Sequence, residues 1–80
     1  MHFSLRFSPS EDIKLIVSVS KKVAKKAVTR NLIKRRVRAI FRTLTPKLKV
    51  GTYLIIARAG SEGVKGKELE SELFKLLAVN

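Results

Sequence analysis

The sequence predicts an α+β protein, an α/β sandwich in which a small sheet is covered by two helices in the order β-β-α-β-α. Residues 2–8 alternate apolar and polar side chains, as half-buried strands do, and two later segments are rich in β-branched residues. Two further segments repeat apolar side chains at helical spacing. With 45% hydrophobic and 30% charged residues, residues 1–80 are expected to form one domain.

The first two elements are predicted to be strands. Residues 2–8 place Phe3, Leu5 and Phe7 on one face, and residues 13–19 (IKLIVSV) are largely apolar and β-branched. Between them, the sequence PSED has the composition of a turn. We therefore expect the two strands to pair antiparallel through a short hairpin.

The third element is predicted to be a helix that begins near residues 27–29. Its apolar stripe comprises Val23, Ile33, Val37, Ile40, Phe41 and Leu44. Lys26 and Arg30 fall within the same stripe, so we expect residues 20–26 to form an irregular entry to the helix. Pro46 ends the helix, because the residue before a proline disfavours the α-helical conformation.

The last two elements are predicted to be a strand and a second helix. Residues 50–58 (VGTYLIIAR) are apolar enough for a central strand, and residues 59–66 contain three glycines and are expected to form a loop. From Lys67 onward, leucines recur at helical spacing. A strand, a helix and a strand in succession indicate a crossover, so the second and third strands are expected to be parallel neighbours.

Composition restricts the class of protein. There is no cysteine, which excludes disulfides and thiolate zinc sites. The sequence has no run of 18 apolar residues and no signal-peptide pattern, so a cytoplasmic location is expected. The net charge of +12 indicates a polyanionic partner: RNA, DNA or an anionic membrane.

The positive charge is concentrated in residues 21–42, where ten of 22 side chains are Lys or Arg and none is acidic. Cations three or four residues apart on a helix repel one another, so this arrangement opposes helix stability. The side chains expected on the flanks and outer face, where they would suit phosphate groups, are Lys34, Arg35, Arg38 and Arg42. A merely solvated face, a membrane-surface helix and DNA binding remain alternatives at this point.

The sequence offers no constellation for catalysis by the protein itself. His2 is the only histidine and is interpreted as an ordinary strand residue. Glu11 and Asp12 are adjacent, so their side chains diverge, while Glu68 and Glu72 share a helix face among lysines. We therefore expect no catalytic residue and no metal site in the chain.

The segment VSVSKKVAKKAVTRNLIKRRVRAIFR resembles the signature of the bacterial ribonuclease P protein component, roughly S-K-K…A-V-x-R-N-R-x-K-R-x-x-R-E. The matching positions are Ser20, Lys21, Lys22, Ala27, Val28, Arg30, Asn31, Ile33, Lys34, Arg35 and Arg38. The similarity extends from about Phe3 to the C-terminus. Two positions depart from the signature, with Leu32 in place of an arginine and Ala39 in place of a glutamate.

This resemblance implies that a separate RNA subunit, with Mg²⁺, removes the 5′ leader from precursor tRNA. The protein is expected to bind ribonuclease P RNA and precursor tRNA, with no membrane partner and no cofactor of its own. The residues expected to contact RNA are Lys21, Lys22, Lys25, Lys26, Arg30, Asn31, Lys34, Arg35, Arg38 and Arg42. The resemblance also implies a left-handed βαβ crossover, where general statistics favour a right-handed one. A ribosomal-type structural RNA-binding protein without a processing role is the alternative.

Members of this family have an N-terminal helix and strand ahead of the position of His2, which we expect this chain to lack. Aromatic side chains in that part line the family's cleft for the leader. Phe3 and Phe7 are candidates for this contact here, since stacking on an exposed ring is worth ~1–3 kcal/mol per base. The alternative that we favour is that both are core residues. An open sheet edge would also make a homodimer possible.

Overall fold

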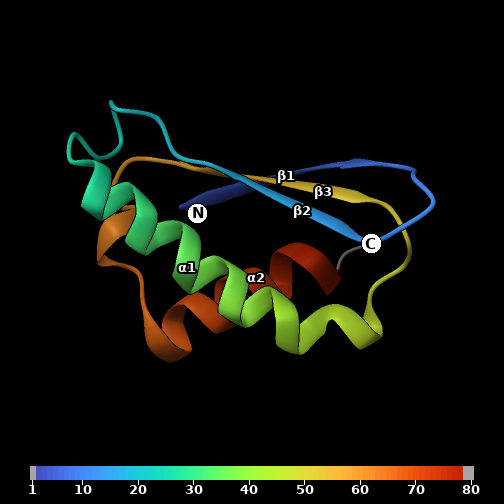
Figure 1. Ribbon diagram of the computed structural model, residues 1–80. Helices are drawn as coiled ribbons and strands as arrows, with labels where there is room; N and C mark the ends of the chain where they lie inside the picture. The colour runs from blue at the N-terminus through green and yellow to red at the C-terminus, as the bar shows by residue number, and fades with distance from the viewer. Residues whose placement is uncertain (1, 79–80) are drawn as a thin grey trace.

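The computed structural model describes residues 2–78, in which two helices cover one face of a three-stranded sheet (Figure 1). The strands are β1 (Phe3–Ser8), β2 (Lys14–Ser18) and β3 (Thr52–Ala57). The helices are α1 (Ala27–Leu44) and α2 (Gly66–Ala78), and short 3₁₀ turns occupy Thr45–Lys47 and Ser61–Gly63. The predicted order β-β-α-β-α is confirmed.

The strand β3 lies between the other two strands. It runs antiparallel to β1, with Phe7 opposite Tyr53, and parallel to β2, with Leu15 opposite Tyr53. The predicted central third strand and its parallel pairing are therefore confirmed, whereas the predicted hairpin between the first two strands is wrong. Every residue of β3 is buried or half-buried, so β3 is the strand best suited to the centre of the sheet, with a hydrogen-bonded strand on each side. A three-stranded sheet with β3 in the middle cannot also pair β1 with β2.

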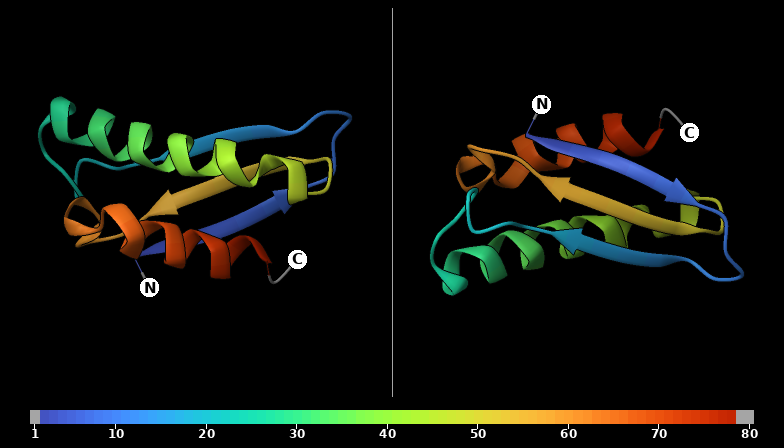
Figure 2. Two further views of the ribbon diagram at one scale, coloured as in Figure 1. Left: turned by 90° about the horizontal axis from the view of Figure 1, so that it is seen from below. Right: turned by 90° about the horizontal axis from the view of Figure 1, so that it is seen from above.

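The crossover from β2 through α1 to β3 is left-handed. In the right-hand view of Figure 2 the sheet lies in front of the helices, β2 and β3 both run from right to left, and β3 lies above β2. A right-handed connection with these directions would place β3 below β2. The implied handedness is thus confirmed, and it leaves α1 over β2 and α2 over β1.

The hydrophobic core fills the space between the sheet and the helices. Its largest fully buried side chains are Tyr53, Phe3, Ile33, Ile55, Leu69, Leu73 and Val37. The ring of Tyr53 meets Phe7 and Phe41 edge-on, at centroid distances of 5.1 and 5.5 Å. Burial raises the pKa of the Tyr53 hydroxyl, which donates a hydrogen bond of 2.6 Å to the carbonyl of Lys49. The contact between Phe41 of α1 and Tyr53 of β3 packs the helix directly against the sheet.

The boundaries of α1 follow the sequence prediction. Before it, residues 20–26 are irregular, with the amides of Val23 and Ala24 donating to the carbonyl of Ser20. At the other end, α1 stops at Leu44, and Pro46 lies in the 3₁₀ turn that follows. The apolar stripe is confirmed: Ile33, Val37 and Phe41 are buried, and Val23, Ile40 and Leu44 pack partly buried against them.

The first strand is anchored to α2 through a single glutamate. The backbone amide of His2 donates to Oε2 of Glu72 at 3.1 Å, and Nδ1 of the His2 ring lies 3.1 Å from Oε1. His2 lies one residue before β1 and has a structural role there, where it was interpreted as an ordinary strand residue.

Candidate nucleic-acid interface

Four cations form a continuous face along α1, which we call the cationic face: Lys34, Arg35, Arg38 and Arg42. Because Lys34, Arg38 and Arg42 follow one another at intervals of four residues, they align along one side of the helix. All are exposed except Lys34, which is half-buried, and Asn31 is exposed four residues before Arg35. The expected positions on the flank and outer face of the helix are therefore what the structure shows.

No carboxylate of the chain neutralises this face within residues 2–78. The ion pair found there joins His2 to Glu72, and neither residue lies on α1. The first turn of α1 contains no acidic residue either. Because the helix cannot offset its own charge, an external anion is the natural counterion of the cationic face.

The loop before α1 adds four exposed lysines, Lys21, Lys22, Lys25 and Lys26. Arg30 holds this loop in place, since its Nη1 donates to the carbonyl of Ala24 at 3.0 Å and to that of Lys25 at 2.8 Å. Arg30 was expected to face RNA, but it is half-buried and turns one amino group back onto the loop. Its position is aligned with the core stripe of α1, and its side chain reaches the loop while staying partly exposed to solvent.

The N-terminal end of α1 is itself electropositive. Its N-cap residue is Lys26, in an extended conformation, and no side chain within residues 2–78 caps the helix amides. Free N–H groups at a helix N-terminus attract anions, and two exposed lysines at positions 25 and 26 reinforce that attraction. The loop lysines and the cationic face therefore present positive potential along the whole length of α1.

One arginine of the basic segment is directed elsewhere. Nη1 of Arg36 donates to the carbonyl of Glu62 at 2.9 Å, which ties α1 to the turn Ser61–Gly63. Arg36 therefore has a structural role and is not part of the cationic face. The spacing of charges in the sequence could not distinguish it from Arg35 or Arg38, because all three belong to one basic run.

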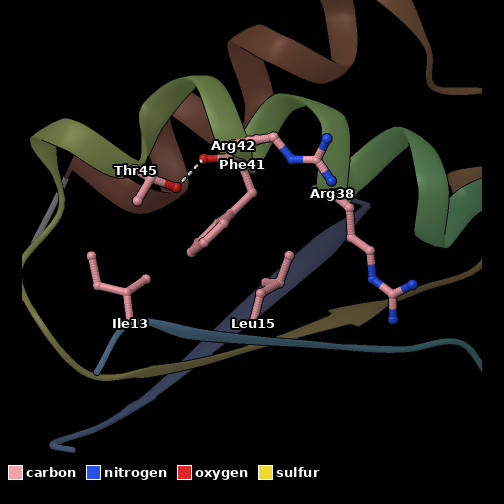
Figure 3. Close-up of a pocket in the computed structure, with 6 residues that line it drawn as sticks. All are labelled: Ile13, Leu15, Arg38, Phe41, Arg42 and Thr45. Atoms are coloured by element: carbon pink, nitrogen blue, oxygen red, sulfur yellow. Dashed lines mark hydrogen bonds between the residues drawn. The ribbon is translucent and has the colours of Figure 1, made fainter. Parts of the chain in front are cut away.

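A groove lined by both apolar and charged side chains runs along the cationic face, between α1 and residues 13–15 at the start of β2 (Figure 3). Its residues are Ile13, Leu15, Arg38, Phe41, Arg42 and Thr45. In Figure 3 the aliphatic side chains of Ile13 and Leu15 point toward α1, and the ring of Phe41 points down between them. The two arginines lie at the end of the groove away from Thr45, so an apolar surface and two guanidinium groups adjoin.

Among residues 2–78, no helix covers the second face of the sheet (Figure 1). We call it the open sheet face; by strand alternation its members are Ser4, Arg6, Ser8, Lys14, Ile16, Ser18, Thr52, Leu54 and Ile56. Arg6, Leu54 and Ile16 form one row across the three strands, and Ile16 is 53% exposed. This face combines cations, hydroxyl groups and aliphatic surface. Sequence reasoning missed it, although the polar half of the alternation in residues 2–8 pointed to it.

The two candidates for leader contact lie on the opposite, helix-covered face. Phe3 is 2% exposed, so it is a core residue, and the proposed stacking role is wrong for it. Phe7 is half-buried, with its ring edge-on to Tyr53 and the Nζ of Lys49 4.6 Å from its centroid. A side chain at Gly51 would overlap the ring of Phe7, which shows how closely the backbone covers it. The favoured alternative, that both rings belong to the core, is confirmed for Phe3, whereas Phe7 packs partly buried against the core.

Neither a membrane span nor a metal cluster appears in the described part of the chain. No helix there combines the length and apolar character needed to cross a bilayer. Residues 2–78 also hold no group of three or more His, Cys, Asp or Glu side chains that could share a metal ion. Glu68 and Glu72 line one depression together with Ser71 and Lys75, and Glu72 is already engaged by His2.

The fold and the surface together define a small basic α+β protein whose longer helix carries an exposed cationic face. Comparison with known proteins identifies the family. Residues 1–79 match the family model described as Ribonuclease P, so the chain belongs to the ribonuclease P protein family.

Relatives within this family are similar over most of the chain. The ribonuclease P protein component of Picosynechococcus is 43% identical over 70 residues, which is 86% of this chain and 60% of that protein. The Microcystis aeruginosa protein of the same name is 44% identical over 62 residues, 76% of this chain and 52% of its own length. The chain thus spans between half and two thirds of these relatives. The structure of the Staphylococcus aureus RNase P protein superposes with a TM-score of 0.84 at 26% identity, covering 96% of this chain and 72% of that one.

Proposed function

We propose that this chain is the protein subunit of ribonuclease P, which binds the catalytic RNA subunit and assists removal of the 5′ leader from precursor tRNA. The observation that carries the proposal is the cationic face of α1, which no carboxylate within residues 2–78 neutralises. Family membership supports RNA as the anion, in preference to DNA or a membrane. Mg²⁺ and the hydrolysis itself are assigned to the RNA, and no step of the proposal passes through a metal bound by the protein.

Contacts with phosphates would make the affinity for RNA steeply dependent on salt. Each phosphate neutralised by a lysine or arginine releases counterions from the RNA. If the loop lysines and the cationic face together contact six to ten phosphates, the affinity should fall by roughly 10³–10⁵ between 50 and 200 mM salt. Arg35, Arg38 and Arg42 suit this role because guanidinium groups bind phosphate oxygens in a bidentate manner.

For the leader, the open sheet face is the surface we propose, in place of Phe3 and Phe7. A single RNA strand needs cations for its phosphates and flat or aliphatic surface for its bases. Arg6 and Lys14 supply the cations, and Leu54 with the exposed Ile16 supplies the aliphatic surface. Sheet faces without a covering helix are used in this way by other RNA-binding domains.

Reconstitution tests the proposal. The chain is added to a cognate ribonuclease P RNA at low Mg²⁺, where the protein's cations matter most, and precursor tRNA cleavage is measured. We expect a clear gain over the RNA alone. The variant Arg35→Gln/Arg38→Gln should lose most of this gain, while Lys65→Gln/Lys67→Gln, which removes two exposed cations near the start of α2, should keep it.

Two outcomes would contradict parts of the proposal. RNA binding without any gain in cleavage would favour a ribosomal-type structural RNA-binding protein. For the open sheet face, Arg6→Gln/Ile16→Thr should weaken cleavage of substrates with a leader and leave affinity for leaderless tRNA unchanged. Equal effects on both substrates would reject that surface as the leader site.

A further inference from the structure

The outward side of α1 carries two exposed apolar side chains among its cations. Val28 is 77% exposed and Leu32 is 36% exposed. Their spacing of four residues places them next to each other on the helix, and neither contributes to the hydrophobic core. We call this pair the apolar ridge.

The fold itself gives no reason for the apolar ridge. The core-facing side of α1 is supplied by other residues, of which Ile33, Val37 and Phe41 are buried. Valine is a weaker helix former than lysine, glutamine or glutamate, so a polar residue at position 28 would suit the isolated helix better. Single exposed apolar residues are ordinary, whereas these two adjoin on the same helix that carries the cationic face.

We propose that the apolar ridge packs against ribose and base surfaces of the RNA bound by the cationic face. This inference rests on the proposed function and adds a second kind of contact to it. Asn31 and Arg35 lie three residues from Val28 and Leu32 on the helix and are exposed. An apolar protein or lipid partner would have to bury these polar and charged groups without supplying an anion. RNA offers both a surface for the apolar ridge and anions for the charged groups, because its wide minor groove displays sugar and base edges between two rows of phosphates.

The two kinds of contact differ in their response to salt. Phosphate contacts weaken as salt rises, because they depend on counterion release. Apolar contacts depend on the area removed from water and are nearly insensitive to moderate salt. A ridge variant should therefore lower affinity by the same factor at every salt concentration, and a cation variant should also change the slope.

The experiment measures the dissociation constant of the full chain for transcribed ribonuclease P RNA over a salt series. The ridge variant is Val28→Thr/Leu32→Gln, which keeps shape and helix propensity but removes apolar surface. We expect binding about tenfold weaker with an unchanged slope. The control Val50→Thr repeats the valine substitution at a 52% exposed position outside α1 and should bind like the wild type. Lys34→Gln should reduce the slope by about 0.7–0.9.

The outcomes separate this inference from the proposed function. A ridge variant within about twofold of the wild type would overturn the inference, as would a loss of affinity accompanied by a change of slope. A wild-type chain that shows no salt-dependent RNA binding would instead reject the proposed function, whatever the variants do. Circular dichroism shows whether the double variant keeps its helices, and Leu32→Gln alone serves as the second variant if it does not.

Discussion

The two helices bury similar apolar stripes against one sheet but carry different kinds of surface. In α2, Glu68 lies in the first turn and Lys75 in the last, which complements the helix macrodipole, and both signs of charge are present. In α1, no acidic residue is present, no side chain of residues 2–78 caps the N-terminus, and Arg42 stands in the last turn. The sheet needs only an apolar stripe from each helix, and Arg30 and Arg36 hold neighbouring loops, so the charges of the cationic face are the ones left to serve something outside the fold.

The largest effect expected from any change concerns the core that both helices share. Leu73→Ala should lower the free energy of unfolding by about 2–5 kcal/mol, because Leu73 is fully buried and its loss leaves a cavity. Urea denaturation measures this. The neighbouring Phe74, which is 50% exposed, is the control, and Phe74→Ala should cost clearly less. Equal losses at both positions would show that α2 does not pack as described.

The next prediction is that one substitution on α1 changes the free energy of unfolding and the affinity for RNA in opposite directions. Arg38→Glu places a carboxylate four residues from both Lys34 and Arg42, so the free energy of unfolding should rise by about 0.5–1 kcal/mol. The affinity for RNA should nevertheless fall by more than about tenfold. Lys67→Glu makes the same charge change on α2 and should alter RNA affinity much less. A parallel loss of stability and affinity in the Arg38 variant would contradict this division of roles.

A smaller effect is expected at the junction of the loop and α1. Arg30→Gln removes the hydrogen bonds to the carbonyls of Ala24 and Lys25 and should cost about 1 kcal/mol, since the arginine is only half-buried. Hydrogen exchange at the amides of Val23 and Ala24, which bond to Ser20, should become faster. Arg35→Gln removes the same charge without touching the loop. If it accelerates exchange equally, Arg30 is not the anchor.

The smallest effect concerns the charge pattern of α2. Glu68→Gln should lower the free energy of unfolding by about 0.3–1 kcal/mol at low salt, because Glu68 interacts with the positive end of the helix macrodipole. The loss should shrink as salt screens the interaction. Glu70→Gln, further along the helix, should change stability less. Identical losses at low and high salt would indicate a cause other than the macrodipole.

The elements of the fold were predictable because each depends on a local pattern. The alternation in residues 2–8, the apolar stripe of α1 and the stop at Pro46 are periodicities or backbone restrictions that neighbouring residues impose. The choice of strand partners was not predictable in this way. The hairpin expectation failed because a turn-like sequence permits pairing of its flanking strands but does not require it, and β3 competes for the same edge.

The candidate site also combines features that the sequence predicts with features that depend on the tertiary structure. The absence of acidic residues in residues 21–42 is a property of the sequence, and it was enough to indicate a polyanionic partner. The separate roles of Arg30, Arg36 and Arg38 depend on where each side chain ends: on a loop carbonyl, on Glu62 and beside a groove. Those endpoints come from segments outside the helix. The sequence sets Arg30 apart by placing it within the apolar stripe, but it contains no information on the partners of these side chains.

The sequence by itself determined the two helices, the three strands and the sign and position of the surface charge, because propensity, periodicity and charge are properties of neighbouring residues. The tertiary structure alone decided that β1 pairs with β3 and not with β2, that Ile16 lies exposed on the open sheet face, and which cations within residues 2–78 remain free. These outcomes depend on which surfaces compete for burial once the chain is folded. Burial and strand pairing depend on contacts between distant parts of the chain, which local sequence patterns do not specify.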